Sequence, residues 1–199
     1  MKQIIVENTN ENPIVIAVTG ASGAIYAHRT LELILQSGAS VHLVITNTAR
    51  HIIEVELPAE KADLLLNSSD VIRHDINSYS ETIASGSYMT SGMIIIPASM
   101  GTIGRIANGT SDNLIIRTAD VHLKEKRKLI VVPRETPLNR IHLENLMKLH
   151  DAGALILPAT PSFYSNAGSI DDLIDTVVAR VLNHIGIKHN LDVRYHGRN

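Results

Sequence analysis

Three apolar runs of the sequence end in proline, and each is followed by residues that can do chemistry. The runs end at Pro97, Pro133 and Pro158, and the segments behind them include residues 99–102, 134–135 and 160–164. A proline explains why a strand ends, but it does not explain the polar side chains that follow. In open α/β sheets, ligands bind beyond the carboxyl ends of the strands. These segments are therefore predicted to meet at one site.

A glycine-rich turn, TGASG (19–23), separates the first strong apolar run from an amphipathic stretch. Glycines permit a tight turn, and the free amides at the start of the helix favour an anion. Ser22 adds a hydroxyl. The spacing is not that of the dinucleotide fingerprint, and the second run ends in Thr46-Asn47 without an acid for a ribose. The turn thus predicts a mononucleotide phosphate site rather than an NAD site, with an ordinary strand–helix turn as the alternative.

Residues 97–102, PASMGT, offer hydroxyls and amides at the end of another run. They predict either a second polar contact to the ligand or a plain helix cap. A helix is expected over 112–126, where Arg117, Asp120 and Lys124 share one face. A solvated charge ladder is the usual explanation, but the many apolar neighbours favour a cleft.

Charged and aromatic residues near the other two prolines complete the candidate set. Arg134 and Glu135 lie between two prolines, so their backbone is rigid, which suits catalysis; a surface loop is the alternative. Tyr164 is paired with Arg180, which borders an apolar helix stripe and is expected to point partly inward. An arginine that snorkels to solvent is the alternative.

Two further patterns carry less weight. Asp171, Asp172 and Asp175 match the DDxxD sequence of enzymes that bind magnesium diphosphate. Here they open a helix behind Ser169, where a serine cap and acidic residues are expected because of the helix dipole. His51 is one of 10 histidines and by itself indicates no function. We predict no metal site.

The elements that must position these residues follow from the apolar pattern. Buried parallel strands are predicted at 14–19, 41–46, 93–97, 129–133 and 154–158, with helices between them. The last helix carries an apolar stripe at helical spacing from Ile170 to Ile185. Residues 59–92 are expected to be partly irregular. The pattern predicts one doubly wound α/β domain.

Composition sets limits on the function. The chain has 199 residues, of which 44% are hydrophobic and 19% charged, its formal net charge is −2, and it has no cysteine. This argues against a disordered chain, a nucleic-acid or anionic-membrane partner, a disulfide framework and a thiolate metal site. No apolar run approaches the roughly 18 residues of a membrane span. We expect a cytoplasmic protein.

Taken together, these motifs resemble the UbiX/Pad family of flavin prenyltransferases. The matching strings are TGASGA (19–24), ASGS (84–87), S-x-GT (99–102), DNLI-x-R-x-ADV-x-LKE (112–125), PRETPL (133–138), IHLEN (141–145), GA-x-ILPA (153–159), FY (163–164) and DDL-x-D-x-VVAR (171–180). They span about residues 14–186 in the family's order. Many members have cysteine at position 98 and serine at position 46, where this chain has Ala98 and Thr46.

The resemblance implies a flavodoxin-like (Rossmann-like) fold, with a lead-in at 1–13, the flavin-binding domain at 14–187 and a tail at 188–199 that closes a neighbouring subunit's site. It implies a metal-independent transfer of dimethylallyl from its monophosphate to reduced FMN. The product, prenylated FMN, serves UbiD-type decarboxylases, and ubiquinone synthesis is the expected pathway. Family members usually form dodecamers with sites at subunit interfaces.

Residue roles carry over by position. The FMN-binding residues would be Gly20, Ala21, Ser22, Thr46, Ser99, Met100, Gly101, Thr102, Arg117 and Arg134. The prenyl phosphate would be bound by Lys124, Tyr164 and Arg180, with Tyr195 of the tail closing a neighbour's site. Ser22, Glu56, Lys124 and Glu135 would be catalytic, with Glu135 in proton transfer and Glu56 supplied by a neighbouring subunit.

Two other functions stay open on sequence grounds. One is an FMN-dependent decarboxylase of cysteine-type substrates, which shares the fold but has a Met-Asn segment in place of the Arg-Glu of PRETP. The other is a non-catalytic flavin-binding or assembly module, which would not require Lys124, Glu135 and Arg180 to converge.

Overall fold

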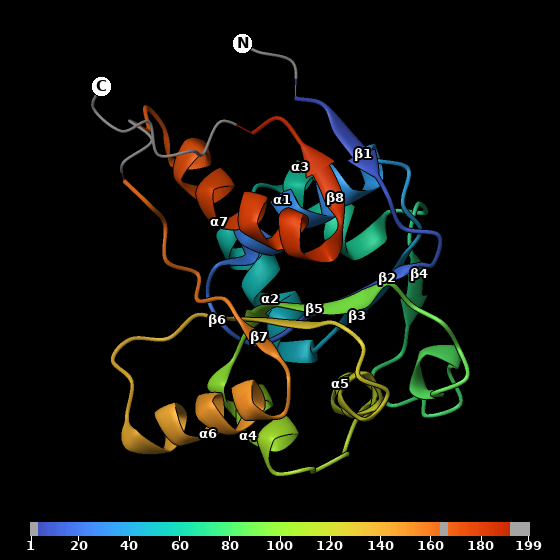
Figure 1. The fold of residues 1–199 in the computed structure, drawn as a ribbon. Coiled ribbons are helices and arrows are strands. Elements are labelled where there is room, and N and C mark those ends of the chain that lie inside the picture. The colour runs from blue at the N-terminus through green and yellow to red at the C-terminus, as the bar shows by residue number, and fades with distance from the viewer. Residues whose placement is uncertain (1–3, 164–166, 192–199) are drawn as a thin grey trace, which may run out of the picture.

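The fold is built on a six-stranded parallel sheet (Figure 1). The computed structural model describes residues 4–163 and 167–191. The strands run in the order β4 (Ile72–His74), β3 (Val41–Ile45), β2 (Ile14–Val18), β5 (Gly92–Ala98), β6 (Leu129–Pro133) and β7 (Leu155–Ile156). The chain winds outward from β2 in one direction and from β5 in the other, so the order reverses between these two strands. The predicted doubly wound α/β fold is confirmed.

Helices cover both faces of the sheet (Figure 1). One layer contains α1 (Ala24–Gln36), α2 (Asn47–Glu56), α3 (Ala59–Asn67) and α7 (Ile170–Ile185). The other contains α4 (Met100–Ala107), α5 (Leu114–Lys124), α6 (Arg140–Asp151) and the short 3-10 helix η1 (Thr82–Ala84). Because each strand turns alternate side chains to the two layers, the central strands are apolar throughout.

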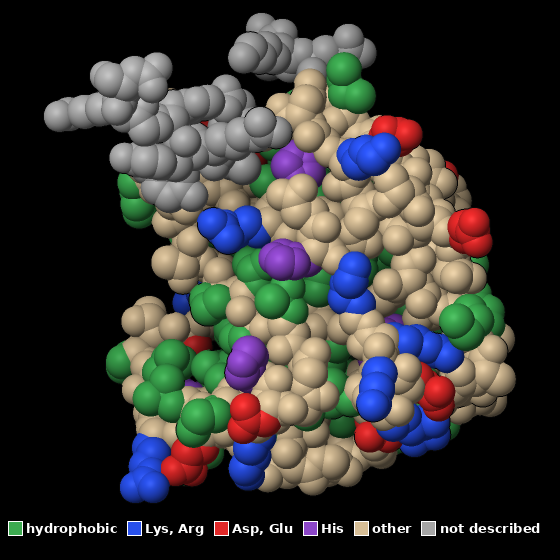
Figure 2. All heavy atoms as spheres, in the orientation of Figure 1, with side chains coloured by type: hydrophobic (Ala, Val, Ile, Leu, Met, Phe, Trp, Pro, Cys, Tyr) green, Lys and Arg blue, Asp and Glu red, His purple; other side chains and the backbone are tan. Residues whose placement is uncertain are grey.

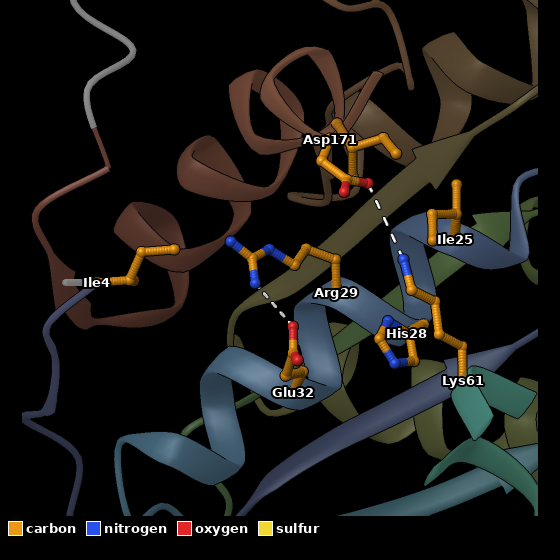
Figure 3. A pocket seen from close by; sticks show the side chains of 8 residues that line it. Ile4, Ile25, His28, Arg29, Glu32, Lys61 and Asp171 are labelled. Atoms are coloured by element: carbon orange, nitrogen blue, oxygen red, sulfur yellow. Dashed lines mark hydrogen bonds and ion pairs between the residues drawn. The ribbon is translucent and has the colours of Figure 1, made fainter. Parts of the chain in front are cut away.

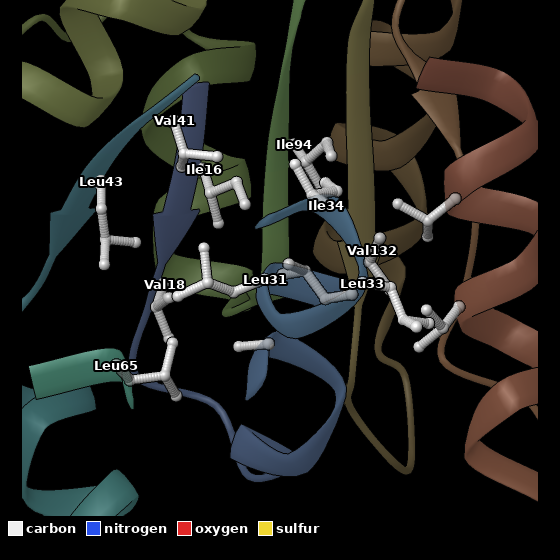
Figure 4. Close-up of a cluster of buried hydrophobic side chains, with 14 of the residues drawn as sticks. Ile16, Val18, Leu31, Leu33, Ile34, Val41, Leu43, Leu65, Ile94 and Val132 are labelled. Atoms are coloured by element: carbon white, nitrogen blue, oxygen red, sulfur yellow. The ribbon is translucent and has the colours of Figure 1, made fainter. Parts of the chain in front are cut away.

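Each layer has its own hydrophobic core. Ile14, Ile16 and Val18 of β2 pack toward α1 and α7, where Figure 4 shows Leu31, Leu33 and Ile34 of α1 facing the sheet. Val15 and Ala17 pack toward α4 and α5 instead. This two-sided burial fixes the sheet and thereby the position of its carboxyl edge.

The predicted strands and the last helix are confirmed within a residue or two. Ser169 caps α7 as expected: its hydroxyl accepts the amide of Asp172, and the Asp172 carboxylate accepts the amide of Ser169. The helix expected at 112–126 begins later, behind the cap Asn113.

The elements within residues 59–92 and the strands near the two ends of the described chain were not predicted. Helix α3 and strand β4 lie in the polar segment 59–92, and β4 is an edge strand with only one apolar residue. Strand β1 (Val6–Asn8) pairs antiparallel with β8 (Ile187–His189), so the two ends of the described chain form a small second sheet. That pairing joins residues far apart in the sequence, and neither segment shows it alone. None of the described helices is long and apolar enough to cross a membrane.

Candidate functional site

Thr19 joins two of the predicted ligand loops at the carboxyl edge of the sheet. Its side chain is buried, its hydroxyl donates to the carbonyl of Pro97 (2.9 Å), and it accepts the amide of Ser99 (2.8 Å). The glycine-rich turn behind β2 and the PASMGT segment behind β5 are thereby held side by side. They meet where the strand order reverses, which is where doubly wound sheets bind ligands.

The turn itself depends on two glycines. Gly23, the residue before α1, has φ 111°, a left-handed conformation that favours glycine. A Cβ on Gly20 would lie 2.8 Å from Cγ2 of Thr48 in the first turn of α2. The bare backbone at Gly20 therefore lets α2 approach, and a larger residue would push the two apart.

The amides at the start of α1 already have an anionic partner. The Glu56 carboxylate, at the end of α2, accepts the amides of Gly23 and Ala24, each at 2.8 Å. Burial raises the pKa of Glu56, but hydrogen bonds from Ser22, Gly23 and Ala24 and the charge of Arg134 outweigh this and hold its pKa below the ordinary value. Two amides at the start of α1 are therefore bound by a side chain of the chain itself, and the phosphate site at the turn stays a prediction.

Glu56 lies at the turn of its own chain, and the expectation that it serves a neighbouring subunit stays a prediction. Helix α2 follows β3, and its last residue reaches the turn behind β2 of the same chain. In the described structure, Glu56 belongs to its own chain's turn.

Arg134 completes a cluster with Ser22 and Glu56. Its Nε donates to the Ser22 carbonyl (2.8 Å), and its backbone amide donates to Ala98 (3.4 Å). The side chain is half-buried, whereas that of Glu135 is exposed and accepts the amide of Thr136 (3.0 Å). The two residues therefore diverge, with Arg134 at the turn and Glu135 in solvent.

The start of α4 presents hydroxyls beside this cluster. Ser99 caps the helix by accepting the amide of Thr102 (3.3 Å), and the two hydroxyl oxygens lie 3.0 Å apart. Met100 and Thr102 are buried, while a Cβ on Gly101 would meet nothing within 4 Å. Open backbone at Gly101 next to two hydroxyls fits a flat polar ring such as a flavin. The predicted cap and the predicted ligand contact are compatible roles.

Three further residues predicted to bind the cofactor are Thr46, Ala21 and Arg117. Thr46 caps α2 by accepting the amide of Ala49 (3.1 Å). Ala21 is buried within the glycine-rich turn. Arg117 lies in the first turn of α5 and pairs with Asp120 (3.1 Å) at a half-exposed position, so its charge is directed along its own helix.

Lys124 does not join the cluster. Helix α5 leads into β6, so its last residue lies near the amino ends of the strands, at the opposite edge from Arg134. There Lys124 contacts Glu125 (2.5 Å), and its Nζ would lie 3.0 Å from a Cβ on Gly86. Arg127 fixes the same segment by donating to the carbonyls of Gly86 and Tyr88. Within one chain, Lys124 and the ASGS segment (84–87) form a separate group.

Arg180 is exposed, so the prediction that it points partly inward was wrong. Its neighbours Ala179 and Val181 are fully buried, and together with Val177 and Val178 they already occupy the packed face of α7. Tyr164 and Tyr195 lie outside the described residues.

The acids of the DDxxD match have three different partners. Asp172 closes the cap of α7, accepting the amides of Gly168 and Ser169 (2.9 Å each). Asp175 receives two hydrogen bonds from Arg29 (2.7 and 2.9 Å), and Asp171 lies 4.0 Å from Lys61. Within residues 4–163 and 167–191, no group of three or more His, Asp or Glu side chains is arranged to hold a metal.

A hollow of about 300 Å³ lies between α1, α3 and α7, away from the carboxyl-edge cluster (Figure 3). Arg29, Glu32, Lys61 and Asp171 line it, and Figure 3 shows Arg29 turned to Glu32 and Lys61 turned to Asp171. Since these charges pair with one another, the hollow offers no free charge to a ligand.

Comparison with known proteins identifies the family. Residues 4–182 match the model of the Flavoprotein family. The chain is 48% identical over 188 residues to "Flavin prenyltransferase UbiX" of Halalkalibacterium halodurans, covering 90% of this chain and 91% of that protein. It is 45% identical to "Flavin prenyltransferase LpdB" of Lactiplantibacillus plantarum, covering 92% and 98%.

Solved structures agree with this assignment. AnUbiX (PadA1), crystallised with FMN and dimethylallyl pyrophosphate, is 39% identical, with a TM-score of 0.84 over 96% of this chain and 100% of that one. A dodecameric FMN-dependent UbiX-like decarboxylase from Escherichia coli O157:H7 is 40% identical, with a TM-score of 0.85 over 93% and 100%. The cysteine decarboxylase TvaF shares the fold alone, at 14% identity and a TM-score of 0.55 over 88% and 99%. By sequence and by fold, the chain belongs to the UbiX family of flavin prenyltransferases.

Proposed function

We propose that this protein transfers a dimethylallyl group from dimethylallyl monophosphate to reduced FMN and so makes prenylated FMN. The observation that carries the proposal is the cluster of Ser22, Glu56 and Arg134 beside the Ser99–Thr102 hydroxyl pair, in a chain so similar to flavin prenyltransferases. The alternative, a decarboxylase of cysteine-type substrates, is less well supported, because the cysteine decarboxylase TvaF is only 14% identical and shares the fold alone.

FMN would lie over the turn behind β2 and the start of α4. The residues proposed to hold it are Gly20, Ala21, Ser22, Thr46, Ser99, Met100, Gly101, Thr102, Arg117 and Arg134. Bound reduced FMN supplies an electron-rich ring that accepts the prenyl carbon. Arg134 would orient the ring, because contacts to Ser22 and Ala98 fix its own position.

Proton handling is proposed for Ser22, Glu56 and Glu135. Closing a second bond to the flavin requires loss of a proton, which suits a carboxylate. Glu56 is held ionised at the turn and interacts with Ser22, so the pair would pass a proton at the Ser22 hydroxyl. Glu135 is exposed and would accept a proton only from a ligand lying outside the described cluster.

The prenyl phosphate is assigned to Tyr164, Arg180 and Lys124. A monophosphate leaving group can be stabilised by charge-assisted hydrogen bonds from such cations without a metal. Because Lys124 lies at the opposite edge of the sheet from Arg134, its contribution requires a second copy of the chain. The same holds for Tyr195 and the tail at 188–199, proposed to close a neighbour's site.

Assembly is supported by an exposed apolar surface on α6. Ile141, Leu143 and Met147 are 66%, 54% and 62% exposed, and Figure 2 shows hydrophobic side chains gathered over this helix. Exposed apolar patches of this kind mark protein interfaces. We propose that the chain forms a dodecamer, as the E. coli relative does. We further propose that the protein is cytoplasmic, that a UbiD-type decarboxylase receives its product, and that it serves ubiquinone synthesis.

The test is mass spectrometry of the flavin after anaerobic incubation of the protein with reduced FMN and dimethylallyl monophosphate. The proposal expects a flavin heavier by one prenyl unit. Flavin that binds but stays unmodified would favour a non-catalytic module. Decarboxylation of a cysteine-ended peptide by the same preparation would favour the decarboxylase.

A further inference from the structure

The backbone pairing between β2 and β5 ends before the two ligand loops begin. The last paired residues are Ala17 and Ile95, although β5 continues to Ala98. The glycine-rich turn follows β2 and the start of α4 follows β5, so the sheet ladder does not by itself set the distance between these loops. Thr19 lies just beyond the last paired residue of β2, where another contact is needed.

Thr19 supplies this contact through its amide and its hydroxyl. Both groups donate to the carbonyl of Pro97 (3.2 and 2.9 Å), and the hydroxyl oxygen accepts the amide of Ser99 (2.8 Å). Without the hydroxyl, the Pro97 carbonyl would keep a backbone donor, but the Ser99 amide would lose its acceptor. Because Thr19 is only 1% exposed, water does not readily replace that acceptor.

Ser99 connects this buried contact to the proposed ligand side. Its backbone is held by Thr19, whereas its side-chain oxygen accepts the amide of Thr102 (3.3 Å) and lies 3.0 Å from the Thr102 hydroxyl. A turn of the Ser99 backbone would therefore move the hydroxyl pair. On the other side, the Thr19 carbonyl accepts the amide of Ala21 (2.7 Å) within the glycine-rich turn.

We propose that Thr19 is a positioning residue for the flavin ring, because its hydroxyl sets the orientation of Ser99 and thereby of the Ser99–Thr102 hydroxyl pair. The inference rests on the proposed flavin-binding function and gives a role to a residue that the resemblance left without one. Thr19 is buried, so it acts through Ser99 and does not touch the ring. The effect concerns the ring alone, and FMN and riboflavin should therefore respond equally.

The test measures the affinities for FMN and riboflavin, by quenching of flavin fluorescence, in the wild type, Thr19→Val and Thr19→Ser. Valine keeps the shape of the side chain without the hydroxyl, and serine keeps the hydroxyl without the methyl group. Losing one hydrogen-bonded contact predicts that Thr19→Val binds both flavins about tenfold more weakly. Thr19→Ser should bind as the wild type does, even where the lost methyl group lowers its melting temperature.

Thr30→Val is the matched control. Thr30 is fully buried on α1, and its hydroxyl has no hydrogen-bond partner among the described residues. The same substitution removes no contact there, so the flavin affinities should equal those of the wild type. If Thr19→Val does not fold, Thr19→Ala takes its place, because alanine and serine differ by the hydroxyl alone.

A second set of variants tests whether Thr19 acts through Ser99. In a Ser99→Ala background the hydroxyl pair is already lost, so adding Thr19→Val should weaken flavin binding much less than it does in the wild type. Equal weakening in the two backgrounds would mean that Thr19 acts elsewhere and would overturn the inference.

The remaining outcomes separate the inference from the proposed function. If the wild type binds flavin and Thr19→Val binds it equally well, the inference is overturned while the proposed function stands. The same holds if Thr19→Ser loses as much affinity as Thr19→Val, since a purely structural role makes affinity follow stability in both variants. If the wild type binds neither flavin, the proposed function fails and the inference fails with it.

Discussion

Removing the Glu56 carboxylate tests whether the start of α1 is stabilised from within the chain. Gly23 precedes the helix and has no side chain that could cap it, so the Glu56 carboxylate is the group that accepts the first amides. Glu56→Ala removes both hydrogen bonds and the charge, whereas Glu56→Gln keeps an oxygen acceptor and loses only the charge.

The magnitude follows from these contacts. Losing a side-chain cap costs about 1 kcal/mol of unfolding free energy, and a charge at the helix start adds roughly 0.3–1 kcal/mol. We therefore expect a loss of about 1–2 kcal/mol for Glu56→Ala and about 0.5 kcal/mol for Glu56→Gln at pH 7. Glu54→Ala is the control, since Glu54 is an exposed acid on the same helix with no hydrogen bond to described residues.

The sign of the pH dependence is fixed by the lowered pKa of Glu56. A carboxyl whose pKa is lower in the folded state stabilises the protein above its unfolded pKa, and this stabilisation is lost as the pH falls through the folded pKa. The difference between wild type and Glu56→Gln should therefore be full at pH 7 and shrink in acid.

Urea unfolding at one fixed protein concentration measures this, because the midpoint shifts by the change in free energy divided by the slope m. With m of about 2 kcal/mol/M, Glu56→Ala should unfold roughly 0.5–1 M urea earlier than wild type. Equal midpoints at pH 7, or a difference that does not change down to pH 3.5, would refute the capping role.

Four further outcomes are expected. Gly20→Ala should weaken FMN binding and lower thermal stability, because its Cβ would overlap Thr48; a melting temperature and flavin affinity equal to wild type would contradict this. Ser22→Ala should slow prenylation while the circular dichroism spectrum stays native, since Ser22 is exposed; an unchanged turnover rate would remove Ser22 from the site. FMN should bind more tightly than NAD in calorimetry, and the reverse order would exclude a mononucleotide site. Prenylation should persist in excess EDTA, and Arg180→Ala should weaken the use of the prenyl donor about tenfold or more. Asp172→Asn should affect mainly the stability of the protein. Activity that needs magnesium and all three acids of the DDxxD match would show that the phosphate was assigned to the wrong residues.

The strands and helix caps that depend on a local residue pattern could be predicted from the sequence. Continuous apolar runs located β2, β3, β5 and β6, because strands buried on both faces contain little else. Pattern also located the cap of α7. It did not reveal β4, where edge exposure removes the apolar signal, or the β1–β8 pairing, which depends on contacts across most of the chain.

The candidate site was predictable in its loops and less so in its contacts. Helical spacing placed Arg117 and Lys124 on one face, but seven residues of helix separate them by about 10 Å, and only the fold shows that Lys124 is at the far end. Glu56 lies 33 positions from its partner Gly23 in the sequence, and Arg134 lies 112 positions from its partner Ser22. No local pattern encodes such contacts, so the sequence alone could not predict that Glu56 binds the amides at the start of α1.

A partly buried chain of four hydrogen-bonded side chains connects β3 and β4 to the segment around η1. Glu81 contacts His74 (2.6 Å), His74 contacts His42 (2.7 Å), and His42 contacts Tyr88 (2.9 Å). An ionised carboxylate can only accept, so His74 carries its hydrogen on Nδ1. Nε2 of His74 and Nδ1 of His42 share one hydrogen, and Nε2 of His42 lies 2.9 Å from the Tyr88 hydroxyl. Burial, and next the adjacent His74, lower the pKa of His42, in agreement with a neutral ring.

These contacts hold the segment around η1 against the sheet. His42 belongs to β3, whereas Glu81 and Tyr88 flank η1, so the chain of hydrogen bonds fastens both ends of that segment to the sheet. The ASGS residues lie between these two anchors, and Gly86 of that segment is close to Lys124. The segment next to Lys124 is thus held by side chains to which the resemblance assigned no role.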